Sequence, residues 1–104
     1  SVGDIPDSVT SIGNNAFYGC SKLESVDLSN TQITSIGNYV FSACKSLTSI
    51  DLPSSVTSIA GYAFNSCTNL TTINYHGTPE QFAAITVNSG NTPFTNATVN
   101  YIQP

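Results

Sequence analysis

Hydrophobic positions recur along this chain at intervals of 23 or 24 residues. The segment SIGNNAFYGC, residues 11–20, returns as SIGNYVFSAC, residues 35–44, and as SIAGYAFNSC, residues 58–67. Repeats of this length are typical of coiled proteins in which each copy stacks on the next. The copies share seven apolar columns: Ile5/Leu28/Leu52, Val9/Ile33/Val56, Ile12/Ile36/Ile59, Phe17/Phe41/Phe64, Cys20/Cys44/Cys67, Leu23/Leu47/Leu70 and Val26/Ile50/Ile73.

The pattern within one copy changes its period twice. In LESVDL, Val26 and Leu28 lie on one face of an extended strand, because side chains alternate along strands. In NNAFYGC, Ala16, Phe17 and Cys20 share one face of a short helix. Each copy therefore predicts a strand, a turn, a second short extended segment and one or two helical turns.

The three copies occupy residues 4–26, 27–50 and 51–73, and the second is one residue longer than the others. Its extra residue falls in LSNTQIT, residues 28–34, which predicts a loop, since loops tolerate changes in length. A single copy buries too few side chains to compensate for the entropy lost when its backbone is ordered. We therefore expect the copies to share one continuous core, as in a solenoid.

The pattern stops at Asn74, and residues 74–104 are predicted to form a cap within the same structural domain. Thr78 is placed to cap a helix, with Pro79 at its first position and Gln81 completing a capping box. This predicts a helix from Pro79 to Val87. It is expected to bury two side chains, Phe82 and Ile85.

A last strand is predicted over ATVNYI, residues 97–102, where Val99 and Tyr101 alternate with smaller or polar residues. Helix and strand together would cover the open end of the coil and the edge of its sheet. The chain of 104 residues contains no Met, so we expect it to be a processed product or a piece of a longer protein.

Charge excludes several classes of partner. Only 8% of the residues are charged, the net charge is -4, and the cations are Lys22 and Lys45. Nucleic acids and anionic membrane surfaces require a clustered basic face, so neither is an expected partner. No apolar run approaches the roughly 20 residues that span a bilayer, so no membrane insertion is expected.

The cysteines and the single histidine are the first candidates for chemistry. Cys20, Cys44 and Cys67 are separated by the repeat period, which is not the spacing of a CxxC metal motif. They predict reduced thiols that fill the core, and the alternative is a disulfide or a metal site. His76 has no nucleophile and orienting group beside it in the sequence, so we expect it at the surface or in the cap. The sequence therefore predicts no catalytic residue, cofactor or metal.

The candidate site is a column of aspartates at equivalent positions of the copies, namely Asp4, Asp27 and Asp51, followed by Asn74. It occupies the positions that alternate with the buried residues, so it should point outward on the sheet. Like charges on neighbouring strands repel, which suggests a contact face for a basic or hydroxyl-rich partner, or weak binding of a hard cation such as calcium. The alternative is that these residues serve solubility. The candidate contact face comprises Asp4, Ser25, Asp27, Ser49, Asp51, Thr72 and Asn74.

The motif LxxLxL at residues 23–28 and 47–52 resembles a leucine-rich repeat. The longer segment LPSSVTSIAGYAFNSCTNLTTI, residues 52–73, is similar to the BspA-like, or Treponema-type, repeat LPxxVTxIGxxAFxxCxxLxxI. That resemblance implies a right-handed coil with a parallel sheet on one side and short helices on the other, often closed by a cap. It also implies a secreted or cell-surface protein of bacteria or protists with a role in adhesion.

The expected fold class is thus an α/β solenoid with a helix–strand cap. The expected function is a non-enzymatic interaction or adhesion module that binds a protein or a surface glycan through the concave sheet face. The alternative is a structural spacer that displays another domain of a longer protein.

Overall fold

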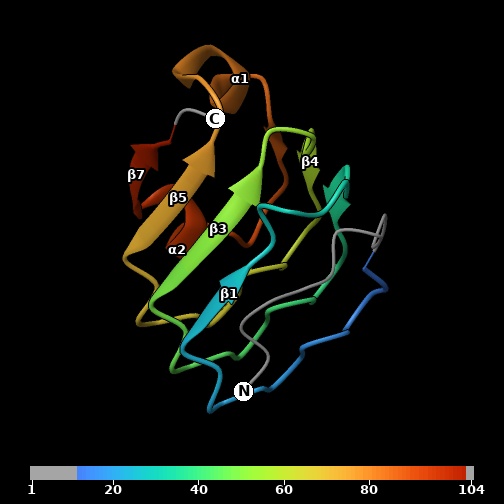
Figure 1. Cartoon of the computed structure of the whole chain (residues 1–104). Coiled ribbons are helices and arrows are strands. Elements are labelled where there is room, and N and C mark those ends of the chain that lie inside the picture. The colour runs from blue at the N-terminus through green and yellow to red at the C-terminus, as the bar shows by residue number, and fades with distance from the viewer. Residues whose placement is uncertain (1–11, 103–104) are drawn as a thin grey trace.

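A computed structural model describes residues 12–102, which wind into a coil with two parallel sheets on its walls (Figure 1). The larger sheet has the strand order β1-β3-β5-β7, and the smaller has the order β2-β4-β6. The larger sheet consists of β1 (Ser25–Asp27), β3 (Ser49–Pro53), β5 (Thr72–His76) and β7 (Thr98–Tyr101). The smaller consists of β2 (Ser35–Ile36), β4 (Ser58–Ile59) and β6 (Thr86–Val87). Two short helices are α1 (Pro79–Ala83) and α2 (Thr92–Thr95).

The strands pair in the register that the repeat predicts. Val26 lies opposite Ile50, and Ile50 lies opposite Ile73. In the smaller sheet Ile36 lies opposite Ile59. Equivalent residues of successive copies therefore stack directly, and the predicted α/β solenoid is confirmed.

The core is the interior of the coil, where the apolar columns meet. Phe41 is 0% exposed, and its ring stacks between those of Phe17 and Phe64, with centroids 5.3 Å away on each side. Phe94 extends this row beyond Phe64 at 5.0 Å. Stacked rings bury a large apolar area along the axis of the coil. Of the predicted columns, Ile5 and Val9 lie outside the described residues.

The predicted helical turns of the repeats are instead runs of turns. The backbone N–H of Phe41 donates to the carbonyl of Ala63, and that of Ala43 donates to Asn65, both at 2.8 Å and both in the next coil. These donors are therefore not available for bonds along a helix. Left-handed residues also interrupt any helix at two repeated positions. They are Asn15, Tyr39 and Tyr62 at the first, and Gly19, Ala43 and Ser66 at the second.

The helix predicted in the C-terminal segment is shorter than expected. The capping box of Thr78 and Gln81 is present, but α1 ends at Ala83 instead of Val87. Thr86 and Val87 form β6, which pairs with β4 and so extends the smaller sheet. The register of the coil thus overrides the helical pattern over these two residues. Of the two side chains expected to be buried, Ile85 is buried and Phe82 is half-buried.

Both sheets continue past residue 73. β7 confirms the predicted last strand and pairs with β5, so Val99 lies opposite Ile73. The short helix α2 was not predicted, and it carries Phe94 into the phenylalanine row. The division into repeats up to residue 73 and a cap over 74–104 stays a prediction, although the cap continues the geometry of the coil.

A row of tyrosines lies on the outside of the turns. Tyr18, Tyr39 and Tyr62 are 58%, 39% and 42% exposed, and the rings of Tyr39 and Tyr62 stack with centroids 5.6 Å apart. Gly90 closes the row, because its φ is +82° and a Cβ there would collide with the ring of Tyr62. Only glycine satisfies both conditions.

Candidate functional site

The candidate face consists of the outward side chains of the larger sheet. In β3 and β5, Ile50, Leu52, Ile73 and Tyr75 are buried, and the residues that alternate with them are partly exposed, except for Pro53 at the end of β3, which is buried. We call these outward positions the polar face. It comprises Ser25, Asp27, Ser49, Asp51, Thr72, Asn74, Thr98 and Asn100. Figure 1 shows the strands β1, β3, β5 and β7 of this sheet side by side. Asp4, the remaining predicted member, lies outside the described residues.

The aspartate column continues as a hydrogen-bonded ladder. Asn100 Nδ2 donates to Asn74 Oδ1 at 3.1 Å, and Asn74 Nδ2 donates to Asp51 Oδ1 at 3.1 Å. Asp27 Oδ1 accepts the backbone N–H of Ser29 at 2.9 Å and also the hydroxyl of Ser29. The expected repulsion between carboxylates is thus offset. Each carboxylate accepts hydrogen bonds, and the equivalent positions on the next two strands, β5 and β7, carry the neutral amides Asn74 and Asn100.

His76 joins this column from the end of β5. Its Nε2 lies 2.9 Å from Asp51 Oδ2, and the two side chains are 29% and 26% exposed. An ionised carboxylate only accepts, so Nε2 carries the proton in this contact. The sequence places His76 at the end of a strand but does not pair it with Asp51. The signal was available, because His76 is two residues after Asn74 and therefore points to the same side of the sheet.

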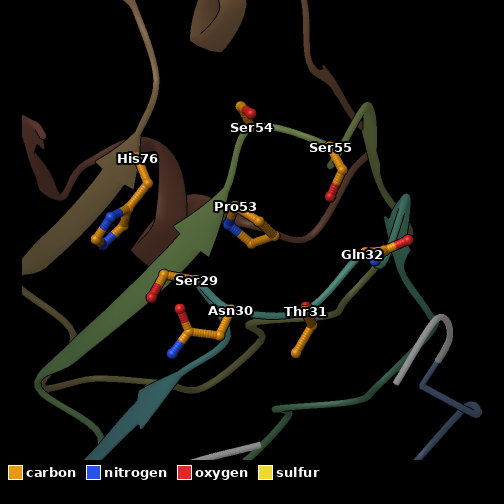
Figure 2. A pocket seen from close by; sticks show the side chains of 8 residues that line it. All are labelled: Ser29, Asn30, Thr31, Gln32, Pro53, Ser54, Ser55 and His76. Carbon is orange, nitrogen blue, oxygen red and sulfur yellow. The ribbon is translucent and has the colours of Figure 1, made fainter. Parts of the chain in front are cut away.

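A pocket of about 460 Å³ lies beside the ladder, at the carboxyl ends of the strands (Figure 2). One side is formed by the loop between β1 and β2, with Asn30 and Gln32. The opposite side is formed by Pro53 and Ser54 after β3, and His76 closes the end. The first loop contains the extra residue of the second copy. The sequence predicts this loop but not the pocket, which requires three coils to be placed side by side.

The model of the BspA-type leucine-rich repeat region, with six copies, matches residues 3–102. The chain belongs to the BspA-type leucine-rich repeat family. Among solved structures, it is similar to a leucine-rich cell surface protein from Faecalibacterium prausnitzii A2-165. The two share 27% identity and a TM-score of 0.53 over 86% of this chain and 35% of that protein. No curated protein matches. The chain is thus a leucine-rich-repeat module, as the motif predicts.

The cysteine column of this BspA-type repeat fills space in the coil. Cys44 and Cys67 are buried, Cys20 is half-buried, and all three are free thiols, which fits the prediction of reduced core cysteines. Cys44 Sγ donates to the carbonyl of Phe17 at 3.2 Å, and Cys67 Sγ donates to that of Phe41 at 2.9 Å. Each thiol therefore satisfies one carbonyl of the preceding coil. Burial raises the pKa of Cys44 to about 11 and that of Cys67 to about 12.

These thiols predict low reactivity. In the native protein at neutral pH, Cys44 and Cys67 should not react with dithiobis(nitrobenzoate) on the time scale on which unfolded chains react, because the reagent attacks an accessible thiolate. Half-buried Cys20 should react faster than either. Thiol titration with and without denaturant measures this. Three fast-reacting thiols in the native protein would contradict the packing.

The same pKa shifts predict a loss of stability in alkali. The thiols of the unfolded chain ionise near pH 9.0, whereas in the folded chain those of Cys44 and Cys67 stay protonated to about 11 and about 12. The unfolded state releases protons first, so the free energy of unfolding should fall as pH rises above 9.0. Thermal unfolding of C44A/C67A should show a smaller alkaline loss than the parent, and an equal loss would count against this origin.

Within residues 12–102, no three His, Cys, Asp or Glu side chains are grouped to hold a metal ion. Both oxygens of Asp51 already accept hydrogen bonds, from Asn74 and His76. The ladder is thus built from hydrogen bonds and offers no oxygen cage of the kind that calcium prefers. In the same part of the chain, neither helix has the length and apolar character that crossing a bilayer requires.

Proposed function

We propose that this chain is a non-enzymatic interaction module of a secreted or cell-surface protein, and that it binds a protein or a surface glycan through the polar face. The observation that carries the proposal is the Asp51–Asn74–Asn100 ladder. It fixes three polar side chains on neighbouring strands at hydrogen-bonding distance from one another. These side chains point outward and take no part in the apolar core.

A face of this kind is suited to binding because its side chains are already ordered. Long side chains lose rotamer entropy when a partner immobilises them, and this cost weakens association. The ladder and the parallel register hold Asp51, Asn74 and Asn100 in place before a partner arrives. Ser49, Thr72 and Thr98 form a second row of hydroxyls beside them. Together they present donors and acceptors in two straight rows.

The expected setting at the cell surface is supported by the similar protein of Faecalibacterium prausnitzii, which is described as a cell surface protein. This chain covers only 35% of that protein's length. The properties of the remaining segments of that protein are therefore not assigned to this chain. Adhesion in the present chain rests on the polar face itself.

The test introduces one large side chain on the face and one away from it. Thr72→Arg places a long cation in the centre of the hydroxyl row, whereas Thr68→Arg makes the same change at an exposed turn outside the sheet. Binding of the purified chain is measured on an array of extracellular proteins and on an array of surface glycans. We expect Thr72→Arg to weaken the binding by at least about tenfold, which corresponds to about 1.4 kcal/mol. Thr68→Arg should leave it unchanged.

Two results would overturn the proposal. If the parent chain binds nothing on either array, a spacer that displays another domain accounts better for the chain. If Thr68→Arg and Thr72→Arg lose binding equally, the polar face is not the contact surface. The double variant Asp27→Asn/Asp51→Asn measures how much the two carboxylates contribute to binding. If the contact is purely electrostatic, the binding of this variant should no longer depend on salt concentration.

A further inference from the structure

We propose that the pocket beside the ladder binds a neutral, hydroxyl-rich ligand, namely a single sugar ring of a surface glycan. This inference rests on the proposed function, because it names the ligand class for one part of the same surface. The pocket lies at the carboxyl edge of the polar face, next to the contact between His76 and Asp51.

Its size and construction fit a small ligand. A volume of about 460 Å³ falls within the range of about 300–1,000 Å³ that small-molecule sites occupy. Its inner hydroxyls are fixed by the loops themselves. Thr31 Oγ1 donates to the carbonyl of Leu28 at 2.8 Å, and Ser55 Oγ donates to that of Ile33. These bonds give the pocket a defined shape before a ligand enters.

Its outer polar groups remain available. Within the described part of the chain, the side chains of Asn30, Gln32 and Ser54 make no hydrogen bond, and all three are exposed. Figure 2 shows them around the same opening, from two different loops. Each amide offers both a donor and an acceptor, and so does each hydroxyl. A sugar ring presents the same mixture, because each of its hydroxyls donates once and accepts.

Two rings provide the apolar part of the wall. Pro53 and His76 end the neighbouring strands β3 and β5 and lie opposite each other in the register. Both residues line the pocket, but Pro53 is buried and His76 is half-buried, so the ring of His76 is the more accessible of the two. This ring can pack against the C–H face of a sugar while the amides reach its hydroxyls. Polar groups that converge on an apolar surface are typical of small-ligand sites.

The charge of the pocket favours a neutral ligand over an anion. Neither Lys22 nor Lys45 is among its lining residues. Two carboxylates contact lining residues instead: Asp27 Oδ1 accepts the hydroxyl of Ser29, and Asp51 Oδ2 is 2.9 Å from Nε2 of His76. Phosphate and carboxylate groups require cationic partners or ordered backbone donors. The lining therefore disfavours them and leaves hydroxyl groups as the matching chemistry.

The experiment is a titration of the isotopically labelled 104-residue chain, followed by its amide NMR signals. The probes are the methyl glycosides of glucose, galactose, mannose and N-acetylglucosamine, together with inorganic phosphate. We expect saturable shifts with at least one glycoside, with a dissociation constant on the order of 1 mM, and none with phosphate. The shifts should be confined to the signals of Asn30, Gln32, Ser54 and His76.

Variants decide whether the pocket is the site. Asn30→Ala and Gln32→Ala remove exposed amides that make no contact, so the fold should be retained, and each should weaken binding by several-fold. Ser54→Trp should abolish binding by filling the opening. Asn96→Ala is the control, because it removes an exposed amide far along the chain from the pocket loops. An unchanged NMR spectrum outside the pocket verifies folding in each case.

The inference is overturned if no glycoside gives saturable shifts, if phosphate binds more tightly than every glycoside, or if Asn30→Ala and Gln32→Ala have no effect. Its failure is separable from that of the proposed function. If Thr72→Arg loses binding on the arrays and no glycoside shifts the NMR signals, the proposal for the polar face stands and the proposal for the pocket fails. If the chain binds a glycoside in the titration but binds nothing on the arrays, the proposal for the pocket stands and the proposal for the polar face fails.

Discussion

Phe41→Ala is expected to lower the free energy of unfolding by about 3–5 kcal/mol. Phe41 is 0% exposed and stacks between Phe17 and Phe64, so truncation leaves a cavity in the middle of the row. Neighbouring coils are held by hydrogen bonds on both sides of this position and cannot collapse into the space. Urea unfolding followed by circular dichroism measures the effect. Domains of this kind have a total stability of about 5–15 kcal/mol, so the change is large.

The matched control is the same truncation at the end of the row. Phe17 is only half-buried, and it stacks on Phe41 alone among the described rings. Phe17→Ala should therefore cost clearly less than Phe41→Ala. Equal losses would mean that the row does not act as a continuous core.

Asn91→Ala is expected to cost about 2–4 kcal/mol, because a buried polar group that loses its partner carries a penalty of about 1–3 kcal/mol. Asn91 is 2% exposed and makes three hydrogen bonds through its side chain. Its Oδ1 accepts the backbone N–H of Phe64 at 2.8 Å, and its Nδ2 donates to the carbonyls of Ala60 and Asn88, each at 2.9 Å. The substitution removes all three bonds and leaves the N–H of Phe64 and the carbonyl of Asn88 without a partner, whereas the carbonyl of Ala60 still accepts the N–H of Ala63.

Asn91→Asp separates hydrogen bonding from volume. Aspartate has nearly the same size but no donor, so it should be as destabilising as Asn91→Ala at neutral pH. Asn96→Ala, at an exposed amide five residues away, should change the free energy of unfolding by less than about 0.5 kcal/mol. Thermal unfolding of the three variants measures this. An Asn91→Ala protein as stable as the parent would show that the cap does not depend on this residue.

Periodicity in the sequence is sufficient to predict the coil, because every coil must be filled by the same columns. The pairing of Val26 with Ile50, and the outward position of Asp27 and Asp51, follow from the repeat alone. The family resemblance is confirmed by the match over residues 3–102. These properties depend only on a residue's position within the repeat, and that position follows from the alignment of the three copies.

The remaining features depend on contacts between coils. Asn91 lies in a turn-rich segment and looks like a solvent-facing residue, yet its side chain satisfies backbone groups of the preceding coil. His76 meets Asp51 diagonally across two strands, so neither residue alone indicates the contact. Thr86 and Val87 continue a helical pattern in sequence but pair as a strand, because β4 offers them an open edge. In each case long-range geometry prevails over local pattern.

The turns bond sideways, from each coil to its neighbour, at repeated positions such as Phe41 to Ala63 and Ala43 to Asn65. Each coil is therefore a template on which an identical coil could be laid. A duplicated copy of residues 51–73 should join without a shift of phase, since every donor it needs is presented by the copy before it. Evolution can thus lengthen such a protein one copy at a time, and each added copy brings another outward pair of polar residues. The length of the polar face is in this sense a matter of gene duplication, independent of the design of any single coil.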